Sequence, residues 1–442
     1  MRKSPVAAVM AALLLVCIGT AAAARDDGDR TGSIKSNQPA DRTDNGGWSG
    51  RDGASGHPLM TAAAIRQAAA QFHVCLRRLA PLAARRGVSP AAFERMTARL
   101  TPDLRIMDLL DSQPEFTKAV WDYLDVLVND DRVAAGRRLL AKYRPVFEAA
   151  EKVYGVDRYV ITAIWGVETN YGEIGGDRPV LRSTATLACI GRRQRYFRDE
   201  FLAALDILNR GDVRPDRFVG SWAGAFGPTQ FMPTAFQRYA VDFDHDGHRD
   251  VIDSMPDLIA STANNLKKAG WRSGETWGYE VVVPANFNFM LADRRRTLTI
   301  GEWQRYGIVR AGGKAFPRLD DKAFLLVPAG IEGPGFLMLP NFRAIMRYNP
   351  AEAYALAIGH LADRLRGGGA FVQHWPRYER VLTRDERLEL QQLLERHGFD
   401  VGEPDGRLGA KTREALRDFQ ARIGRVPDGF ASAGVLERLR RR

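Results

Sequence analysis

The stretch DRYVITAIWGVETNYG, residues 157–172, has the pattern of a buried helix that ends in a tight turn. Asp157 can cap the start of this helix, and Gly172 can terminate it. One face is set by steps of three and four residues: Ile161, Ile164, Trp165 and Glu168. Glu168 therefore lies on the apolar face and in the last turn, where the helix dipole disfavours negative charge. Both effects favour a protonated carboxylic acid, which suits a general acid for glycosidic cleavage. The alternative is a core carboxylate satisfied by a hydrogen-bonding partner.

A second stretch, SWAGAFGPTQFMP at residues 221–233, mixes glycine, proline and aromatic residues too closely for a regular element. Such a segment lets the backbone approach a ligand. Ser221 and Gln230 could hydrogen-bond hydroxyl or acetamide groups. Its aromatic side chains could stack on sugar rings: Trp222, Phe226 and Phe231. The competing interpretation is a tight corner between two helices.

A third stretch, DFDHDGHRDVID at residues 242–253, has the spacing of a calcium-binding EF-hand loop. The expected ligands at positions 1, 3, 5, 7 and 12 are Asp242, Asp244, Asp246, the His248 carbonyl and Asp253. Because aspartate is shorter than the usual glutamate at position 12, Asp257 could close a longer loop instead. The sequence therefore predicts a structural Ca²⁺ site, with an acidic surface turn as the alternative.

Around these stretches the chain is mostly helical, beginning at Leu59. Further helices are expected at about 113–129, 132–153, 157–170, 196–209, 255–269, 341–347 and 351–366. Between about 277 and 340, short apolar segments alternate with proline and glycine turns, which predicts a few strands. Thr383, with Glu386 three residues later, forms a capping box that starts a separate C-terminal unit of about three helices.

Length and charge restrict the class of protein. The chain has 442 residues, which indicates two or three domains, and 45% hydrophobic and 26% charged residues, the balance of a soluble globular protein. The net charge of +11 fits nucleic acid, an anionic membrane or an anionic polymer outside the cell. No basic run with interleaved aromatic residues is present in the sequence, which argues against nucleic acid.

The N-terminus predicts export. Arg2 and Lys3 precede an apolar run at residues 6–18, and small residues follow at 20–24. This is the layout of a secretory signal peptide, and the run is too short to span a bilayer comfortably. We therefore expect a periplasmic protein. Lipidation at Cys17 is the alternative, although Val16 fits poorly before a lipobox cysteine.

Removal of the signal peptide leaves two cysteines, Cys75 and Cys189. Oxidising compartments favour disulfides, so we predict a Cys75–Cys189 bridge. Two buried thiols are the alternative.

The three stretches, in this order, resemble the membrane-bound lytic murein transglycosylase B family of peptidoglycan-cleaving enzymes. The resemblance spans roughly residues 60–370. It also rests on ATLAC at 185–189, RRQRYFRDE at 192–200 and RYNPAEAYALAI at 347–358. It implies a mainly α (α+β) fold, in which a lysozyme-like helical catalytic core carries a small β-containing subdomain and an EF-hand-like loop. It also implies that Glu168 is the catalytic acid and that the loop at 242–253 binds calcium. The implied substrate contacts are Ser221, Gln230, Tyr348 and Asn349, and we further expect contacts from Phe231 and Tyr196.

The C-terminal unit resembles the three-helix peptidoglycan-binding domain that is often appended to cell-wall enzymes. Its signature is LQQLLERHGFDVGEPDGRLGAKTREALRDFQARIG at 390–424. The expected organisation is a signal peptide at 1–24, a flexible tether at 25–58, a catalytic domain at 59–375 and a peptidoglycan-binding domain at 376–442.

The leading functional hypothesis is a lytic transglycosylase that cleaves the MurNAc-GlcNAc β-1,4 bond and leaves 1,6-anhydro-MurNAc ends. The first alternative is a hydrolytic muramidase, which needs a second carboxylate such as Glu173 or Asp177. The second alternative is a non-catalytic wall-binding protein. The expected partners are peptidoglycan glycan strands and, as a further class, proteins of cell-wall synthesis or remodelling. We expect no nucleic acid, no organic cofactor and a monomeric chain.

Overall fold

The computed structural model describes residues 47–53, 55–110 and 119–441. The described residues form two compact units. Unit 1 contains the described residues up to 110, with 174–226 and 232–234, and unit 2 contains 119–173, 227–231 and 235–441. The predicted signal peptide, Cys17 and most of the predicted tether lie outside the described residues.

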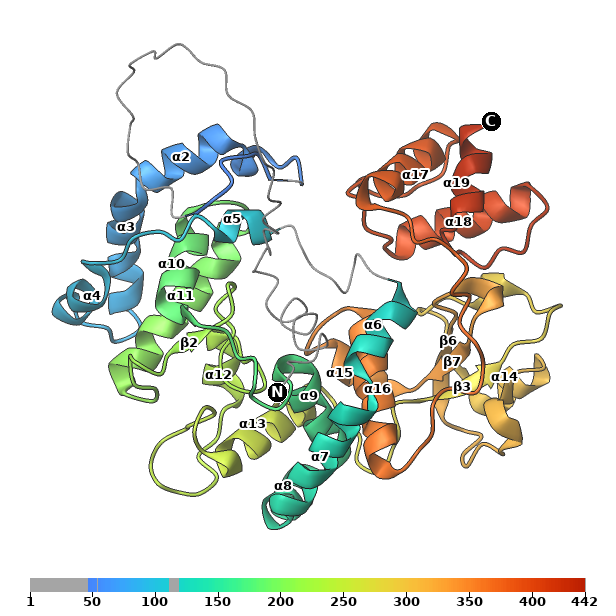
Figure 1. The fold of residues 1–442 in the computed structure, drawn as a ribbon, viewed down its shortest axis with the longest axis horizontal. Coiled ribbons are helices and arrows are strands. Elements are labelled where there is room, and N and C mark those ends of the chain that lie inside the picture. Colours follow the sequence, from blue (N-terminus) through green and yellow to red (C-terminus); the bar gives the residue numbers. More distant parts are fainter. Residues whose placement is uncertain (1–46, 54, 111–118, 442) are drawn as a thin grey trace, which may run out of the picture. The chain divides into compact units, whose positions relative to one another are not determined.

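Unit 1 is helical, and its centre is the pair α10 and α11, which pack along each other and against α3 (Figure 1). Its helices are η1 Pro58–Met60, α2 Ala62–Ala70, α3 Phe72–Ala84, α4 Pro90–Thr97, α5 Ile106–Leu109, α10 Val180–Cys189 and α11 Gln194–Arg210. A short antiparallel pair joins β1 Arg178–Pro179 to β2 Val219–Gly220. Cys75 and Cys189 form the predicted disulfide, with their Cα atoms 5.9 Å apart, so α3 is covalently bound to the end of α10.

Unit 2 is built around α9, which packs against α7 and α16 (Figure 1). Its helices before the sheet are α6 Val120–Leu127, α7 Asp130–Lys142, α8 Arg144–Tyr154, α9 Arg158–Thr169 and α13 Met255–Lys268, together with most of α12 Pro233–Tyr239, whose first two residues belong to unit 1. The expected single helix at 132–153 is wrong. The chain breaks at Tyr143, and α8 begins at Arg144 with Pro145 in its first turn, because proline has no N–H to continue the first helix.

The predicted strands form a five-stranded antiparallel sheet in the order β4-β6-β7-β3-β5. The strands are β3 Gly278–Val282, β4 Leu298–Thr299, β5 Val309–Arg310, β6 Lys322–Leu326 and β7 Gly335–Met338. Between them lie η3 Phe289–Leu291, α14 Ile300–Arg305, η4 Ala311–Gly313 and η5 Gly330–Glu332. Trp303 is fully buried in the core of this subdomain, and its indole N–H donates to the Ala323 carbonyl. The chain then returns to the helical part through α15 Pro340–Met346 and α16 Glu352–Arg366.

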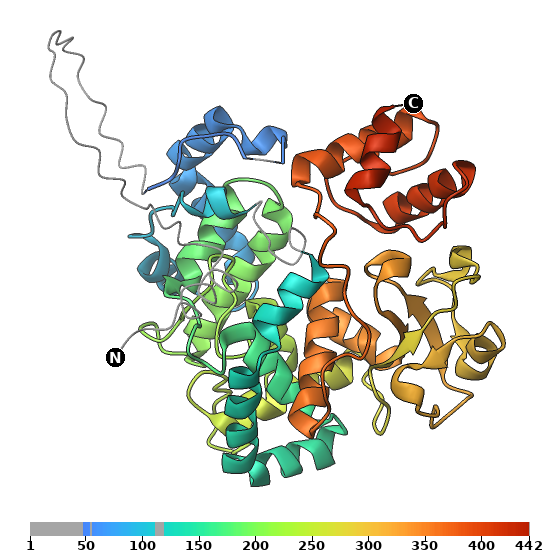
Figure 2. The same ribbon diagram turned by 45° about the vertical axis from the view of Figure 1, so that its right-hand side comes forward.

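The C-terminal residues form the expected three helices, which Figure 2 shows as one compact bundle. They are α17 Arg384–Arg396, α18 Ala410–Arg422 and α19 Ala433–Arg440, and they enclose their own apolar core. The Thr383–Glu386 capping box is present. The bundle also contacts the rest of unit 2: Asp428 accepts from the Ile331 N–H at 3.1 Å.

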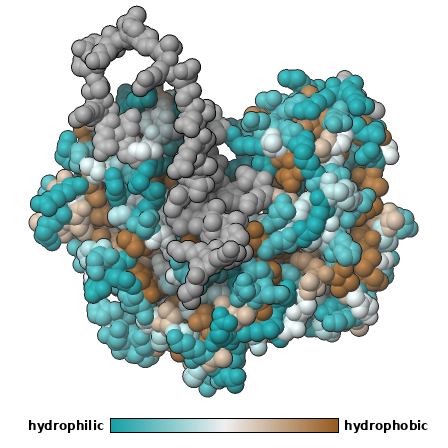
Figure 3. Space-filling view, viewed as in Figure 1, coloured by the Kyte–Doolittle hydropathy of each residue, from teal (hydrophilic) through white to brown (hydrophobic). Residues whose placement is uncertain are grey.

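No helix among the described residues is both long and apolar enough to cross a bilayer. The face visible in Figure 3 is mostly hydrophilic, with hydrophobic residues in small groups.

Candidate active site

Glu168 lies in the last turn of α9, which begins as predicted with Asp157 accepting from the Tyr159 N–H at 2.8 Å. The residues from Val160 to Val167 are all buried, whereas Glu168 is partly exposed. The hydroxyl of Tyr354, on α16, donates to Glu168 Oε1 at 2.6 Å. Burial, and next the negative charge of Glu168, hold the pKa of Tyr354 well above its usual range. Tyr354 therefore remains a donor at any physiological pH and fixes the orientation of the carboxylate.

A short loop at residues 227–231 is tied to the end of α9. The Thr169 hydroxyl donates to the Pro228 carbonyl at 2.5 Å, and the Tyr348 hydroxyl donates to the Thr229 carbonyl at 2.5 Å. Thr229, itself buried, accepts from the Thr262 hydroxyl at 3.0 Å. The loop is therefore held from three separate parts of the chain, α9, α13 and the segment between α15 and α16.

The predicted substrate contacts in unit 2 differ in their exposure: three are partly exposed and one is buried. Gln230 has a positive φ of 53°, and its side-chain amide donates to the Gly227 carbonyl. Tyr348 is partly exposed, and Asn349 accepts from the Ala351 N–H just before α16. These three residues keep a route to solvent.

Phe231, the fourth predicted contact in unit 2, is almost fully buried in this structure. Its side chain is only 1% exposed, and its ring packs edge-on against Tyr348 with the centroids 6.3 Å apart. Phe226, the other phenylalanine suggested for sugar stacking, is fully buried against Phe218. Both rings are therefore packed inside the protein in this structure, and contact of Phe231 with substrate stays a prediction.

Unit 1 contains the other two predicted contacts. Ser221 is partly exposed, and its hydroxyl accepts from the Ala225 N–H at 3.1 Å. The Tyr196 ring is 41% exposed, and its hydroxyl is hydrogen-bonded to Glu200. Glu200 is 1% exposed and accepts from the N–H and the hydroxyl of Thr234. A buried carboxylate thus orients an exposed tyrosine.

The two carboxylates considered for hydrolysis are exposed and lie in different units. Glu173 accepts from the side-chain amide of Asn170 at 2.5 Å. Asp177 lies in unit 1. The helix α9 ends at Thr169, with Asn170 as a left-handed C-cap, which agrees with the predicted end at about Asn170.

Three carboxylates of the acidic loop converge, and all three are among the predicted calcium ligands. Oxygen atoms of Asp242, Asp244 and Asp257 lie within 4.8 Å of one another. Asp257 is fully buried and accepts backbone hydrogen bonds from Phe243, Asp244 and Asp250. Burial, opposed by these hydrogen bonds, raises the pKa of Asp257. A bound cation would stabilise the charged form of Asp257 and so offset the free-energy cost of burying its carboxylate.

Asp246 and Asp253 do not belong to this cluster of carboxylates. Asp246 instead accepts from the His248 N–H at 2.8 Å. Of the two candidates to close the loop, the structure brings Asp257 to the cluster.

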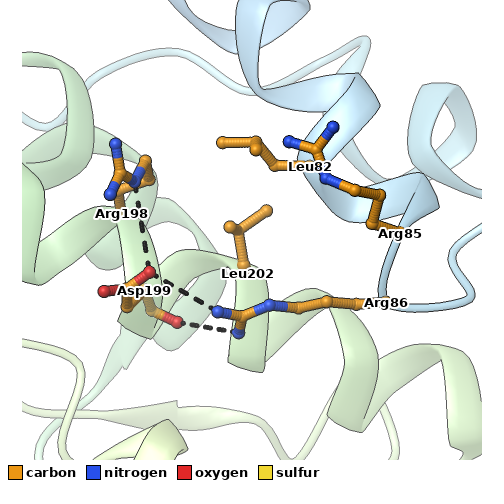
Figure 4. A pocket seen from close by; sticks show the side chains of 6 residues that line it. All are labelled: Leu82, Arg85, Arg86, Arg198, Asp199 and Leu202. Carbon is orange, nitrogen blue, oxygen red and sulfur yellow. Dashed lines mark hydrogen bonds and ion pairs between the residues drawn. The ribbon is translucent and has the colours of Figure 1, made fainter.

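A separate pocket of about 310 Å³ lies on unit 1 between α3 and α11 (Figure 4). It is lined by Leu82, Arg85, Arg86, Arg198, Asp199 and Leu202. Its one carboxylate, on Asp199, pairs with Arg86 at 3.4 Å. An arginine-lined recess with a neutralised acid offers no proton donor for glycosidic cleavage.

A lysozyme-like helical core that presents one carboxylate from a buried helix is the architecture of glycan-cleaving enzymes. The sequence matches the family model "Transglycosylase SLT domain" over residues 71–363 and the model "Putative peptidoglycan binding domain" over residues 383–439. The chain therefore belongs to the transglycosylase SLT-domain family, and it is a lytic transglycosylase, as the sequence resemblance predicted.

Three relatives place the chain within this family. It is 32% identical over 278 residues to the membrane-bound lytic murein transglycosylase B of Escherichia coli (strain K12), which covers 60% of this chain and 74% of that protein. The crystal structure of SltB3 from Pseudomonas aeruginosa, in complex with NAG-anhNAM-pentapeptide, is 44% identical with a TM-score of 0.80, over 84% of this chain and 99% of that chain. Slt35 from Escherichia coli, in complex with calcium, is 28% identical with a TM-score of 0.56, over 68% and 92% respectively.

Proposed function

We propose that Glu168 is the single general acid and base with which this lytic transglycosylase cleaves the MurNAc-GlcNAc β-1,4 bond of peptidoglycan. The observation that carries the proposal is the Tyr354–Glu168 hydrogen bond at 2.6 Å, which orients one carboxylate at the end of a buried helix. Orientation of a catalytic group is a large part of its effect on rate.

The reaction then needs no second carboxylate. The Glu168 carboxylic acid donates its proton to the bridging oxygen as the bond from that oxygen to C1 of the muramic acid breaks. The C6 hydroxyl of the same sugar attacks C1 and gives its proton to the Glu168 carboxylate. A C1–O6 bond forms, the 1,6-anhydro ring closes, no water is consumed and the acid is restored.

Hydrolysis would require a second carboxylate about 5 Å away for retention or ~6.5–9.5 Å away for inversion. The position of Glu173 favours transglycosylation, because its exposed carboxylate is bound to the Asn170 amide. Mass spectrometry of fragments released from purified sacculi is the test, and we expect anhydro ends. Reducing ends would assign a hydrolase.

Glu168→Gln keeps the shape of the side chain and removes the proton, so release of fragments should stop while the circular dichroism spectrum stays unchanged. Substantial turnover by this folded variant would remove Glu168 from the mechanism.

The proposal also covers the substrate contacts, the calcium ligands, the cellular location and the domain organisation. Substrate would contact Ser221, Tyr196, Gln230, Phe231, Tyr348 and Asn349. Ca²⁺ would be held by Asp242, Asp244 and Asp257, in line with the calcium in the Slt35 structure. We further propose an exported, periplasmic protein with a signal peptide at 1–24, a tether at 25–58, a catalytic domain at 59–375 and a wall-binding domain at 376–442.

A further inference from the structure

Arg132, on α7, is a buried charged residue that the mechanism above does not use. Its side chain is 2% exposed. Burial lowers the pKa of Arg132 to about 10, so the guanidinium remains charged at neutral pH. A buried charge is retained only where its surroundings satisfy it, because an unpaired one costs several kcal/mol.

The guanidinium is satisfied by the ends of two helices. Its Nη1 donates to the carbonyls of Val126 and Leu127, at 3.2 Å and 2.7 Å, at the end of α6. Its Nε donates to Asn170 Oδ1 at 3.2 Å, at the end of α9. One cation therefore meets two carboxyl-terminal helix ends, where the helix dipole favours positive charge.

The backbone that Arg132 meets at the end of α9 is unusual. Asn170 and Tyr171 are consecutive residues with positive φ, 49° and 63°. Asparagine tolerates this region, but tyrosine does so at a cost of about 1–2 kcal/mol. Such a turn persists only when its surroundings hold it.

Tyr171 is held by the same helix. Its hydroxyl donates to the Arg132 carbonyl at 3.0 Å. Its ring passes between two glycines, Gly136 on α7 and Gly166 on α9. A Cβ atom at Gly166 would lie 2.7 Å from the ring, so only glycine fits there. Both left-handed residues are thus anchored to α7, directly after the turn that carries Glu168.

From these contacts we propose that Arg132, Asn170 and Tyr171 form a clamp that positions Glu168 for glycosidic cleavage. Arg132 acts through Asn170 and is a positioning residue. The inference rests on the proposed role of Glu168. If the clamp is loosened, the carboxylate should lose alignment with the bridging oxygen while substrate binding is retained.

Asn170→Gly is the sharpest test, because glycine adopts the left-handed conformation easily and removes only the amide. We expect kcat on a soluble glycan fragment to fall about tenfold or more, with KM within about twofold, at a temperature well below unfolding. Tyr171→Phe, which removes one hydroxyl, should shift the same parameter in the same direction.

Asn288→Gly is the matched control. It removes a capping amide from the Met290 N–H in the sheet subdomain and leaves α9 unchanged. We expect its kcat to remain at the wild-type value. Arg132→Lys keeps the positive charge but loses the planar set of N–H donors of the guanidinium. Its kcat should lie between those of the wild type and Arg132→Met, if both variants fold.

A wild-type kcat for Asn170→Gly and Tyr171→Phe would overturn the clamp, whatever the arginine variants do. A loss in Asn170→Gly that follows its melting temperature, and disappears on cooling, would reduce the clamp to a structural role. Failure of the proposed function is distinguishable, because Glu168→Gln would then retain activity.

Discussion

The hydroxyl of Tyr354 and the carboxylate of Glu168 are joined by a 2.6 Å hydrogen bond across 186 residues of sequence. The donor lies on α16 and the acceptor on α9, so the packing of these two helices sets the direction of the carboxylate. Hydrogen bonds to charged groups contribute about 1.5–3 kcal/mol.

Tyr354→Phe should therefore lower kcat by roughly tenfold to a hundredfold, with little change in KM, because only the orienting hydroxyl is lost. Steady-state kinetics on a soluble glycan fragment measure this. Tyr159→Phe is the control on α9, since the Tyr159 ring lies against Arg366. An equal loss in both variants would mean that the Tyr354 hydroxyl has no special role.

Calcium should raise the melting temperature, because a ligand that binds only the folded state stabilises it. Asp244→Asn should abolish the shift, since its carboxylate belongs to the converging cluster. Asp246→Asn changes the same charge outside the cluster and should keep most of the shift. Thermal scans with calcium and with chelator test this. If neither changes the melting temperature of the wild type, the loop at 242–253 is only an acidic surface turn.

His360 should make the protein less stable in acid. Burial, and next the positive charge of Arg364, lower the pKa of His360 to about 4, and its ring stacks on Phe371 at 3.8 Å. The unfolded chain takes up this proton near pH 6.5 but the folded chain only near pH 4. The contribution of neutral His360 to the free energy of unfolding is therefore fully present above about pH 6.5. It is lost as the pH falls from about 6.5 to about 4, by up to roughly 3 kcal/mol.

The measurement is the free energy of unfolding against pH for the wild type and His360→Gln. Buried carboxyls whose pKa is raised, such as Asp363, act in the opposite direction, so only the difference between the two proteins isolates His360. We expect that difference to shrink between pH 6.5 and 4. The exposed His374→Gln is the matched control, and parallel curves for wild type and His360→Gln would contradict the prediction.

Removal of residues 376–442 should weaken binding to sacculi and spare cleavage of soluble fragments, since the candidate site lies before them. The contacts of the bundle add an expected loss of thermal stability, because Phe430 packs against the cluster that contains Trp121 and Ala329. Pelleting, fragment turnover and thermal scans test these three points. A folded truncation that no longer cleaves soluble fragments would place part of the active site in the bundle.

The sequence predicted those parts of the site that depend on local spacing. The face of α9, the Asp157 cap and the Thr383 capping box all follow from residues within one or two helical turns. The partner of Glu168 could not be read in this way, because a sequence separation of 186 residues carries no distance information. One signal was present: Tyr354 stands in an apolar run at residues 353–359 of α16, and a buried tyrosine needs a hydrogen-bond partner.

The exposure of Phe231 and of Tyr196 could not be read from composition either. Both are aromatic residues in motifs of the same kind, yet Phe231 is 1% exposed and Tyr196 is 41% exposed. Only the packing of distant elements separates a core ring from a surface ring. The break between α7 and α8 at Tyr143 was easier to predict from the sequence, because a proline such as Pro145 is common in the first turn of a helix.

The disulfide between Cys75 and Cys189 closes a loop with a sequence separation of 114 residues. In the chain-entropy model, a loop of this length stabilises the folded chain by roughly 4–5 kcal/mol, although measured gains are often smaller. Both cysteines belong to unit 1, so removal of the disulfide should first weaken the packing of α3 against α10.

Replacing Cys75 and Cys189 with alanine should therefore lower the melting temperature of the protein without residues 1–24. Reduction of the wild type under mild conditions should reproduce that shift, and the double variant should no longer respond to reductant. Thiol titration of the unfolded, unreduced wild type should find no free group. Two titratable thiols per chain, or a double variant as stable as the wild type, would show that the bridge does not hold α3 in solution.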